Sequence, residues 1–168
     1  LHKIDYELEL PSAQVKSGLI LAALNTEGRS KIVEKKITRN HTEIMLESFE
    51  ADIKINTVDS ENYIFVNGKK ELVPKNISVP SDLSSASFFI VAALINKNSF
   101  ITMNNISLNP TRDGILRALN LMQANIQINN KRTTNGELIG DLEIKTSDLK
   151  GCELESDNAK LMIDEYPI

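Results

Sequence analysis

Residues 11–24 read PSAQVKSGLILAAL, and residues 80–94 read PSDLSSASFFIVAAL. Both stretches begin with Pro-Ser and end with Ala-Ala-Leu. A Thr-Arg pair follows each of them, at Thr38-Arg39 and at Thr111-Arg112, and an amphipathic segment and a strand-like segment come after each pair. The chain therefore carries one supersecondary unit twice, with a period of about 70 residues, which is too long for a solenoid repeat.

Each unit is predicted to run strand, helix, strand, helix, strand, strand, which gives the fold class α/β (α+β). In the first unit the predicted elements are Lys3–Leu10, Ala13–Asn25, Ser30–Lys36, His41–Glu50, Asp52–Asn56 and Tyr63–Val66. In the second they are Lys75–Val79, Asp82–Asn96, Ser99–Asn104, Thr111–Gln123, Asn125–Asn129 and Leu142–Lys145. A polar turn is expected at Thr133–Gly136, and a further helix is expected to begin at Asp164-Glu165-Tyr166-Pro167.

The distribution of apolar residues predicts how these elements are layered. Polar and apolar residues alternate along the strands, as in residues 3–10, which is typical of sheets with one solvated face. The first helix of each unit is apolar nearly all round, which is typical of a helix buried on all sides. We therefore expect an inside-out arrangement with buried helices and mixed sheets outside. Because one unit of about 75 residues cannot surround its own helix, several units must share a core.

The composition limits the partners and the setting. A hydrophobic fraction of 41% and a charged fraction of 25% are typical of a globular protein. The net charge of −4 and the pI of about 5.3 argue against a nucleic-acid partner. No apolar run approaches the roughly 20 residues that span a bilayer, so no membrane segment is expected. Cys152 is the single cysteine, which excludes a disulfide framework within one chain and predicts a cytoplasmic location.

Small hydroxyl residues open both apolar helices. Ser12 and Ser81 suit the N-cap position, where a side-chain oxygen accepts a hydrogen bond from a backbone N–H group. A helix N-terminus with free N–H groups also binds phosphate, so both interpretations stay open at this stage. Gln14 in the first turn either reaches a ligand over the helix end or is simply solvated.

Two arginines and one aspartate are further candidates for a site. Arg39 follows a predicted strand and either clamps a phosphate or is a surface cation, and its repeat-mate Arg112 carries the same two interpretations. Asp164 is either an N-cap carboxylate or a group that handles a substrate proton. His2 and His41 have no partner at a telling spacing and are interpreted as structural or exposed. The sequence contains no glycine-rich phosphate loop, zinc motif or nucleophile elbow.

Several short segments together resemble the EPSP synthases (3-phosphoshikimate 1-carboxyvinyltransferases) of the enolpyruvyl transferase family. Their order and spacing match across all 168 residues, which is under half of a full-length enzyme. The segments are residues 10–17 (LPSAQVKS), 38–43 (TRNHTE), 82–89 (DLSSASFF), 108–112 (LNPTR) and 163–168 (IDEYPI).

The resemblance implies a fold and a reaction. The family fold has two globular halves of three such units each, with helices inside and sheets outside. The reaction transfers the enolpyruvyl group of phosphoenolpyruvate to the 5-hydroxyl of shikimate 3-phosphate and releases phosphate, on the route to chorismate and the aromatic amino acids. No metal or organic cofactor is required.

The resemblance also assigns roles to individual positions. Ser12 and Ala13 match positions that line the shikimate-phosphate site. Gln14 matches the residue beside the shikimate ring that reaches phosphoenolpyruvate, and Arg39 matches an arginine on the substrate phosphate. Asp164 matches the aspartate at the reacting 5-hydroxyl, which acts as proton acceptor.

The extent of the match predicts an internal fragment. Residues 1–79 would end one half of the complete enzyme, and residues 80–168 would belong to the other half. The family's N-terminal Lys-Ser pair, its phosphoenolpyruvate-binding Asn and Arg segments and its C-terminal Glu, Lys and Arg residues have no counterpart in this sequence, so the fragment alone is expected to be inactive. The complete enzyme is expected to be a monomer. The fragment is expected to self-associate or to pack its two units together.

Three alternatives remain at this stage. A fragment of the sister UDP-N-acetylglucosamine enolpyruvyl transferase would have the same fold, but the segments at residues 12–17 and 38–43 favour the shikimate enzyme. RNA 3′-phosphate cyclases use a related unit, but the acidic pI argues against them. A non-catalytic binding module with the same unit is the third.

Overall fold

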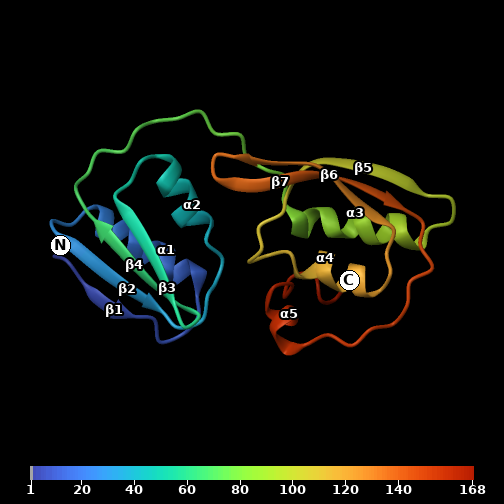
Figure 1. Cartoon of the computed structure of the whole chain (residues 1–168), viewed down its shortest axis with the longest axis horizontal. Coiled ribbons are helices and arrows are strands. Elements are labelled where there is room, and N and C mark those ends of the chain that lie inside the picture. Colours follow the sequence, from blue (N-terminus) through green and yellow to red (C-terminus); the bar gives the residue numbers. More distant parts are fainter. Residues whose placement is uncertain (1) are drawn as a thin grey trace. The chain divides into compact units, whose positions relative to one another are not determined.

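The computed structural model describes residues 2–168, which divide into two compact units with their boundary between Ile77 and Ser78 (Figure 1). Each unit has its own sheet and its own hydrophobic core. Within the described residues, every helix is too short or too polar to cross a membrane.

The first unit is a four-stranded mixed sheet with two helices. The strands are β1 (Asp5–Glu7), β2 (Arg29–Glu34), β3 (Ile53–Val58) and β4 (Glu61–Asn67), and the helices are α1 (Ala13–Leu24) and α2 (His41–Ser48). The strand order is β1-β2-β4-β3, with β1 and β2 parallel and the other neighbours antiparallel. All six elements predicted for this unit are confirmed, with ends that shift by a few residues.

A row of isoleucines on one face of this sheet forms the core of the first unit. Ile64 of β4 lies opposite Ile32 of β2 on one side and Ile55 of β3 on the other. Ile20 of α1 and Leu46 of α2 pack against this row and are buried with it. Each fully buried aliphatic side chain contributes about 1.5–3 kcal/mol, so this contact is the main force that attaches both helices to the sheet.

The second unit has a three-stranded antiparallel sheet and three helices. The strands are β5 (Phe100–Ser107), β6 (Ile126–Thr134) and β7 (Glu137–Lys145), in the order β5-β7-β6, and the helices are α3 (Leu83–Ile95), α4 (Gly114–Leu121) and α5 (Ser156–Lys160). The core joins Ile90 of α3 and Ile115 of α4 to Leu142 of β7. The predicted polar turn is confirmed, since Asn135 and Gly136, both at positive φ, connect β6 to β7.

The predicted strand Lys75–Val79 is wrong. This segment is exposed and irregular, and the chain just after it makes a single parallel bridge, between Ser81 and Ile106. The bridge consists of two hydrogen bonds, from Ser81 N to Asn105 O (2.8 Å) and from Ser107 N to Ser81 O (3.0 Å). A bulge in β5 at this point puts Asn105 at φ 58° and breaks the regular ladder, so alternation alone could not form a strand.

Each apolar helix is covered by its own sheet on one side only. In α1, Val15 and Leu21 are exposed, and in α3 Phe88 and Phe89 are exposed, each by about half or more of their surface. This agrees with the expectation that a single unit cannot surround its helix.

Gly68 is predicted to be required for the first unit. A Cβ atom there would lie inside the van der Waals radii of the carbonyl oxygens of Thr26 and Ala23, both backbone atoms just after α1 or in its last turn. We expect Gly68→Ala to lower the free energy of unfolding of this unit by about 2 kcal/mol or more. Urea denaturation followed by NMR of first-unit resonances measures this change.

Gly18 is the matched control, because a Cβ atom at that position in α1 meets nothing within 4 Å. Gly18→Ala is expected to raise the free energy of unfolding by about 0.5–1 kcal/mol, since alanine is the better helix former. Equal effects of the two substitutions would contradict the assigned role of Gly68.

Candidate functional site

The N-terminus of α1 is open to an anion. Ser12 is the N-cap, in an extended conformation, and its Oγ accepts a hydrogen bond from Val15 N (3.3 Å). The N–H groups of Ala13 and Gln14 precede the first intrahelical hydrogen bond, and the first turn contains no acidic residue. Ser12 and Ala13 are half-buried, and Gln14 is exposed. The positive end of the helix dipole is therefore not neutralised by a carboxylate of its own first turn.

Arg39 lies in the connection between β2 and α2, and its side chain is exposed. Among the described residues 2–168, no carboxylate or carbonyl partner of its guanidinium is found. Thr38, the residue before Arg39, is hydrogen-bonded through its backbone N–H, and α2 begins two residues after Arg39. The backbone on both sides of Arg39 is therefore held in place, while its guanidinium remains available to a ligand.

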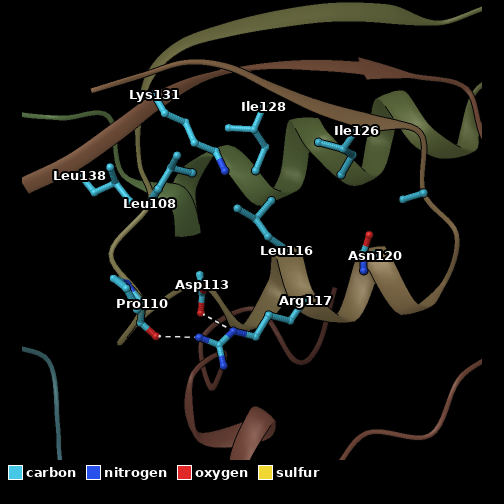
Figure 2. Close-up of a pocket in the computed structure, with 11 residues that line it drawn as sticks. Leu108, Pro110, Asp113, Leu116, Arg117, Asn120, Ile126, Ile128, Lys131 and Leu138 are labelled. Atoms are coloured by element: carbon cyan, nitrogen blue, oxygen red, sulfur yellow. Dashed lines mark hydrogen bonds and ion pairs between the residues drawn. The ribbon is translucent and has the colours of Figure 1, made fainter. Parts of the chain in front are cut away.

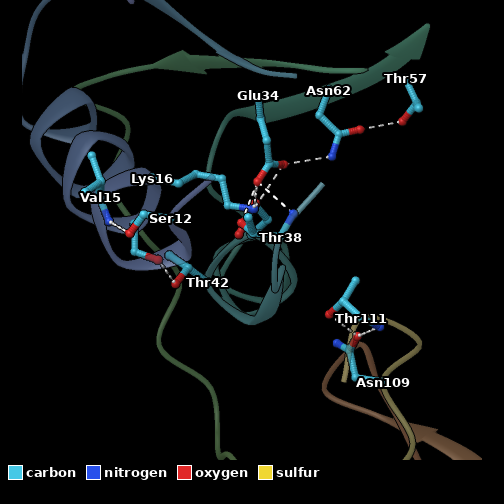
Figure 3. A network of polar contacts seen from close by, with 12 residues as sticks. Ser12, Val15, Lys16, Glu34, Thr38, Thr42, Thr57, Asn62, Asn109 and Thr111 are labelled. Atoms are coloured by element: carbon cyan, nitrogen blue, oxygen red, sulfur yellow. Dashed lines mark hydrogen bonds and ion pairs between the residues drawn. The ribbon is translucent and has the colours of Figure 1, made fainter. Parts of the chain in front are cut away.

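The first unit also contains a fully buried lysine, Lys16 of α1 (Figure 3). Lys16 Nζ lies 3.0 Å from Glu34 Oε1 and 2.7 Å from Glu43 Oε1, and the three side chains are between 0% and 2% exposed. The group carries a net charge of −1 in its ionised form. Removing one partner from such a buried set commonly costs about 3–5 kcal/mol, because the remaining charges lose their compensation.

Polar neighbours complete the shell of Glu34. Its Oε1 accepts hydrogen bonds from Thr38 N (2.9 Å) and Thr38 Oγ1 (2.5 Å), and its Oε2 accepts from Asn62 Nδ2 (3.1 Å). Thr57 Oγ1 in turn donates to Asn62 Oδ1 (2.7 Å). A second contact joins α1 to the start of α2, where the hydroxyls of Ser17 and Thr42 are 2.7 Å apart (Figure 3).

In the second unit, Asp82 and not Ser81 is the N-cap of the apolar helix. The Asp82 carboxylate accepts hydrogen bonds from Ser85 N (2.9 Å) and Ser85 Oγ (2.8 Å). Partial burial tends to raise the pKa of Asp82, but the hydrogen bonds from Ser85 and the charge of Arg112 outweigh it and hold the pKa below its ordinary value. The expected cap at Ser81 is wrong because Ser81 is used in the bridge to β5 instead.

Arg112 connects the N-terminus of α3 to Asp164. Its Nη2 donates to Ser84 Oγ (2.5 Å), lies 3.3 Å from Asp164 Oδ2 and 3.8 Å from Asp82 Oδ1. Ser84 also donates to the buried carboxylate of Glu165. Asp164 itself is exposed at the edge of this cluster.

The helix expected to begin at Asp164 is wrong. The helix of this region is α5, which ends at Lys160, and residues 161–167 form turns. Glu165 N and Tyr166 N both donate to Met162 O, and Met162 is buried in the core of the unit. Pro167, which was expected in the first turn of a helix, is the last residue of these turns.

A groove of about 370 Å³ in the second unit lies apart from these residues (Figure 2). Its lining is mostly apolar and includes Leu116 of α4 and Ile126 and Ile128 of β6. At its edge the Arg117 side chain is used within the unit, by Asp113 Oδ1 (2.7 Å) and by Pro110 O (3.2 Å). None of the predicted site residues lines it, so the groove is not the candidate site.

Comparison with known proteins identifies the family of the chain. The family model of EPSP synthase (3-phosphoshikimate 1-carboxyvinyltransferase) matches residues 1–168. The chain belongs to the EPSP synthase family. The family match does not support the alternative assignments to the sister enolpyruvyl transferase or to the RNA cyclases.

Curated relatives and solved structures agree with this family. The chain is 47% identical over 164 residues to the 3-phosphoshikimate 1-carboxyvinyltransferase of Petrotoga mobilis, and 46% identical over 164 residues to that of Carboxydothermus hydrogenoformans. It is also similar to a solved EPSP synthase from Acinetobacter baumannii, with a TM-score of 0.90 and 43% identity. These matches cover 97–99% of this chain but 37% of each relative. The predicted enolpyruvyl transferase fold is therefore confirmed.

The five site residues expected from the EPSP synthase resemblance fall in both units. Ser12, Ala13, Gln14 and Arg39 are in the first unit, and Asp164 is in the second. Sequence reasoning missed Lys16 and its partners Glu34 and Glu43, because it used Lys16 only as one residue of the segment 10–17 that resembles the EPSP synthases. The sequence did contain a signal that Lys16 is buried. Lys16 has the spacing of one helix face with Ile20 and Ala23, and both of these are core residues.

The charge of Asp82 is predicted to stabilise the second unit in a pH-dependent way. Because the folded-state pKa of Asp82 is below its ordinary value of 3.8, its contribution is complete above that pH and is lost as the pH falls through the folded-state pKa. Asp82→Asn keeps a good N-cap but removes the charge, and it is expected to cost about 0.5–1 kcal/mol at pH 7.

Urea unfolding of the second unit at pH 7 and at a pH well below 3.8 tests this, and the variant and wild type should converge once the pH is below the folded-state pKa. The control is Asp148→Asn, because the Asp148 side chain is 94% exposed and bonds only at the surface to Lys150. A loss for Asp82→Asn that stays constant down to low pH would mean that the charge is not responsible.

Proposed function

We propose that this chain supplies part of the substrate site of an enzyme that transfers the enolpyruvyl group of phosphoenolpyruvate to the 5-hydroxyl of shikimate 3-phosphate and releases phosphate. The observation that carries the proposal is that one compact unit contains both an uncompensated helix N-terminus at Ser12–Gln14 and an exposed guanidinium at Arg39. Backbone N–H groups and an arginine together form a site for a phosphate monoester.

The second unit supports this interpretation by contrast. There the repeat-mate Arg112 is paired with Asp164 and Asp82, and Asp82 also caps α3. The chain thus supplies its own carboxylates to the helix N-terminus and the arginine of that unit. In the first unit the equivalent cap is the neutral Ser12, and the described residues provide no carboxylate to Arg39. An external anion of the substrate fits the place that the first unit leaves open.

The individual roles follow from the family. Ser12 and Ala13 line the shikimate-phosphate site, Gln14 lies beside the ring and reaches phosphoenolpyruvate, and Arg39 binds the phosphate. Asp164 is the proton acceptor at the reacting hydroxyl, a role that needs a carboxylate open to substrate, and Asp164 is exposed. Electrostatic positioning of this kind supplies much of the rate in phosphate-transferring and related enzymes.

The two units belong to different halves of the complete enzyme, with residues 1–79 at the end of one half and residues 80–168 in the other. The boundary between compact units near Ile77 supports this division. The complete enzyme acts as a monomer in the cytoplasm and needs neither a metal nor an organic cofactor.

Arg39→Ala is predicted to weaken binding of shikimate 3-phosphate to this chain. The loss of one charge-assisted contact is expected to cost about 1.5–3 kcal/mol, which is a factor of about ten or more in the dissociation constant. Calorimetry or NMR titration measures it, with phosphoenolpyruvate expected to bind more weakly than shikimate 3-phosphate.

The matched control is Arg29→Ala in the same unit, because the Arg29 guanidinium lies over the Phe65 ring at 4.1 Å and away from the proposed site. This variant should bind as the wild type does. Equal affinity of the Arg39→Ala variant and the wild type would remove Arg39 from the site.

The chain alone is predicted to have no transferase activity. The N-terminal Lys-Ser pair and the C-terminal Glu, Lys and Arg residues that the family uses have no counterpart in these 168 residues, so most of the charged groups that would stabilise the transition state are missing. Incubation with both substrates should release phosphate only at the background rate. Turnover that survives repurification would overturn this expectation.

The chain is also predicted to self-associate through the exposed apolar face of α3. Phe88 and Phe89 are 63% and 65% exposed, and burying such side chains contributes about 1.5–3 kcal/mol each. Light scattering at several concentrations should show assemblies that the Phe88→Gln/Phe89→Gln double variant weakens. The control Phe100→Gln changes an equally exposed phenylalanine on the sheet and should not. A monomer at every concentration would exclude self-association.

A further inference from the structure

We propose that Lys16 is a positioning residue, whose buried ammonium fixes both chain segments that flank Arg39 and so orients the Arg39 guanidinium toward the substrate phosphate. The orientation of Arg39 toward phosphate rests on the function proposed above. The tie between Lys16 and the flanking segments is a property of the folded chain, and it is tested without any ligand.

The first connection runs through Glu34 to the residue before Arg39. Lys16 Nζ contacts both Glu34 oxygens, Oε1 at 3.0 Å and Oε2 at 3.2 Å. The same Oε1 accepts the Thr38 backbone N–H (2.9 Å) and the Thr38 hydroxyl. Since both oxygens of Glu34 are in use, the carboxylate has one orientation, and it holds the Thr38 peptide group in place.

The second connection runs through Glu43 to the helix that follows Arg39. Lys16 Nζ lies 2.7 Å from Glu43 Oε1, in the first turn of α2. Ser17, the next residue of α1, adds a hydroxyl contact to Thr42. The first turns of α1 therefore reach the chain on both sides of Arg39, so a displacement of Arg39 would break contacts at one end or the other.

The second unit shows that the fold itself does not need this lysine. When the repeats are aligned on their shared Ala-Ala-Leu ends, Ile20 matches Ile90, and Lys16 matches Ala86. Ala86 is buried on the same face of α3 and has no charge to pair. In that unit Arg112 is held directly by Ser84 and two carboxylates. The Arg39 guanidinium has no such direct partner in residues 2–168. In the first unit, therefore, the contacts hold the backbone on either side of Arg39 and not its side chain.

Stability gives no better reason for a buried ammonium with two carboxylates. Replacement of buried ion pairs by apolar residues of similar volume is often neutral or stabilising, because desolvation of the charges is unfavourable. Glu43 Oε2 even lacks a hydrogen-bond partner in the described part of the chain. An apolar side chain would fill the space but could not anchor the Thr38 N–H through Glu34. The charged side chains of Lys16, Glu34 and Glu43 therefore add a contact of fixed direction to the Thr38 N–H, which apolar side chains cannot make.

Amide hydrogen exchange of the 168-residue chain tests the anchoring directly. In the Lys16→Met variant the Thr38 amide is expected to exchange about tenfold faster or more, measured relative to the core amides of Ile32 and Ile64. If Lys16→Met only destabilised the unit as a whole, the amides of Thr38, Ile32 and Ile64 would all exchange faster by similar factors. The control Lys35→Met removes a lysine that forms a surface ion pair with Glu7, and it should leave the Thr38 amide unchanged.

A milder variant covers the case in which Lys16→Met does not fold. Glu43→Gln keeps the side-chain volume and the contact between Lys16 and Glu34. It is expected to speed exchange of the Ile44 amide, which donates to Asn40 O (3.1 Å) next to Arg39. If neither Thr38 in the first variant nor Ile44 in the second changes relative to the core, the anchoring role is wrong.

A double-mutant cycle then tests the link to the phosphate. Lys16→Met is expected to weaken shikimate 3-phosphate binding about fivefold, but less than about twofold when Arg39 is already alanine, because the two residues act through one contact. Full additivity would overturn the link to Arg39. Failure of the wild type to bind shikimate 3-phosphate would overturn the proposed function and with it the phosphate role of Lys16, while the exchange data would still decide whether Lys16 orders the segment.

Discussion

The packing of one apolar helix on one sheet face is the contact on which each unit depends. In the first unit Ile20 of α1 meets the row of Ile32 and Ile64, and in the second Ile90 of α3 meets Leu142 and Ile144. These side chains are fully buried, and the polar residues of both units are arranged around them. Because each sheet covers only one side of its helix, the N-terminal turns of α1 and α3 remain at the surface, where the site residues can reach a ligand.

The duplicated unit uses the same backbone plan with different charges. Its N-cap is the neutral Ser12 in one copy and the carboxylate Asp82 in the other. The arginine after the second strand is available in one copy, as Arg39, and paired in the other, as Arg112. The packing is common to both copies, so we attribute a difference in function between the two units to these charged side chains. The anion site proposed for the first unit and the proton acceptor proposed for the second both depend on a few side chains at equivalent positions.

The buried charges of Lys16, Glu34 and Glu43 connect packing to this division. Lys16 lies on the core face of α1, at a position where the other copy has Ala86. An ammonium in that place is stable only if carboxylates meet it, which requires β2 and α2 to bring Glu34 and Glu43 to the same point. The segment that carries Arg39 lies between these two carboxylates in the sequence, so its position depends on the same charges.

The sequence by itself determined the duplication, eleven of the twelve strands and helices predicted for the two units, and the family. It could do so because alternation and helical periodicity are local, and because the Ser12–Gln14 and Thr38-Arg39 segments are short continuous motifs.

Only the tertiary structure decided the rest. It left the expected strand Lys75–Val79 irregular, with a single bridge just after it, since strand formation there depends on a neighbour, β5, that bulges at Asn105. It moved the cap of α3 from Ser81 to Asp82 and buried Glu165 against Ser84. It also paired Lys16 with a residue 18 positions away, Glu34. Such pairings depend on distances between segments remote in the chain, and no local pattern of residue types encodes those distances.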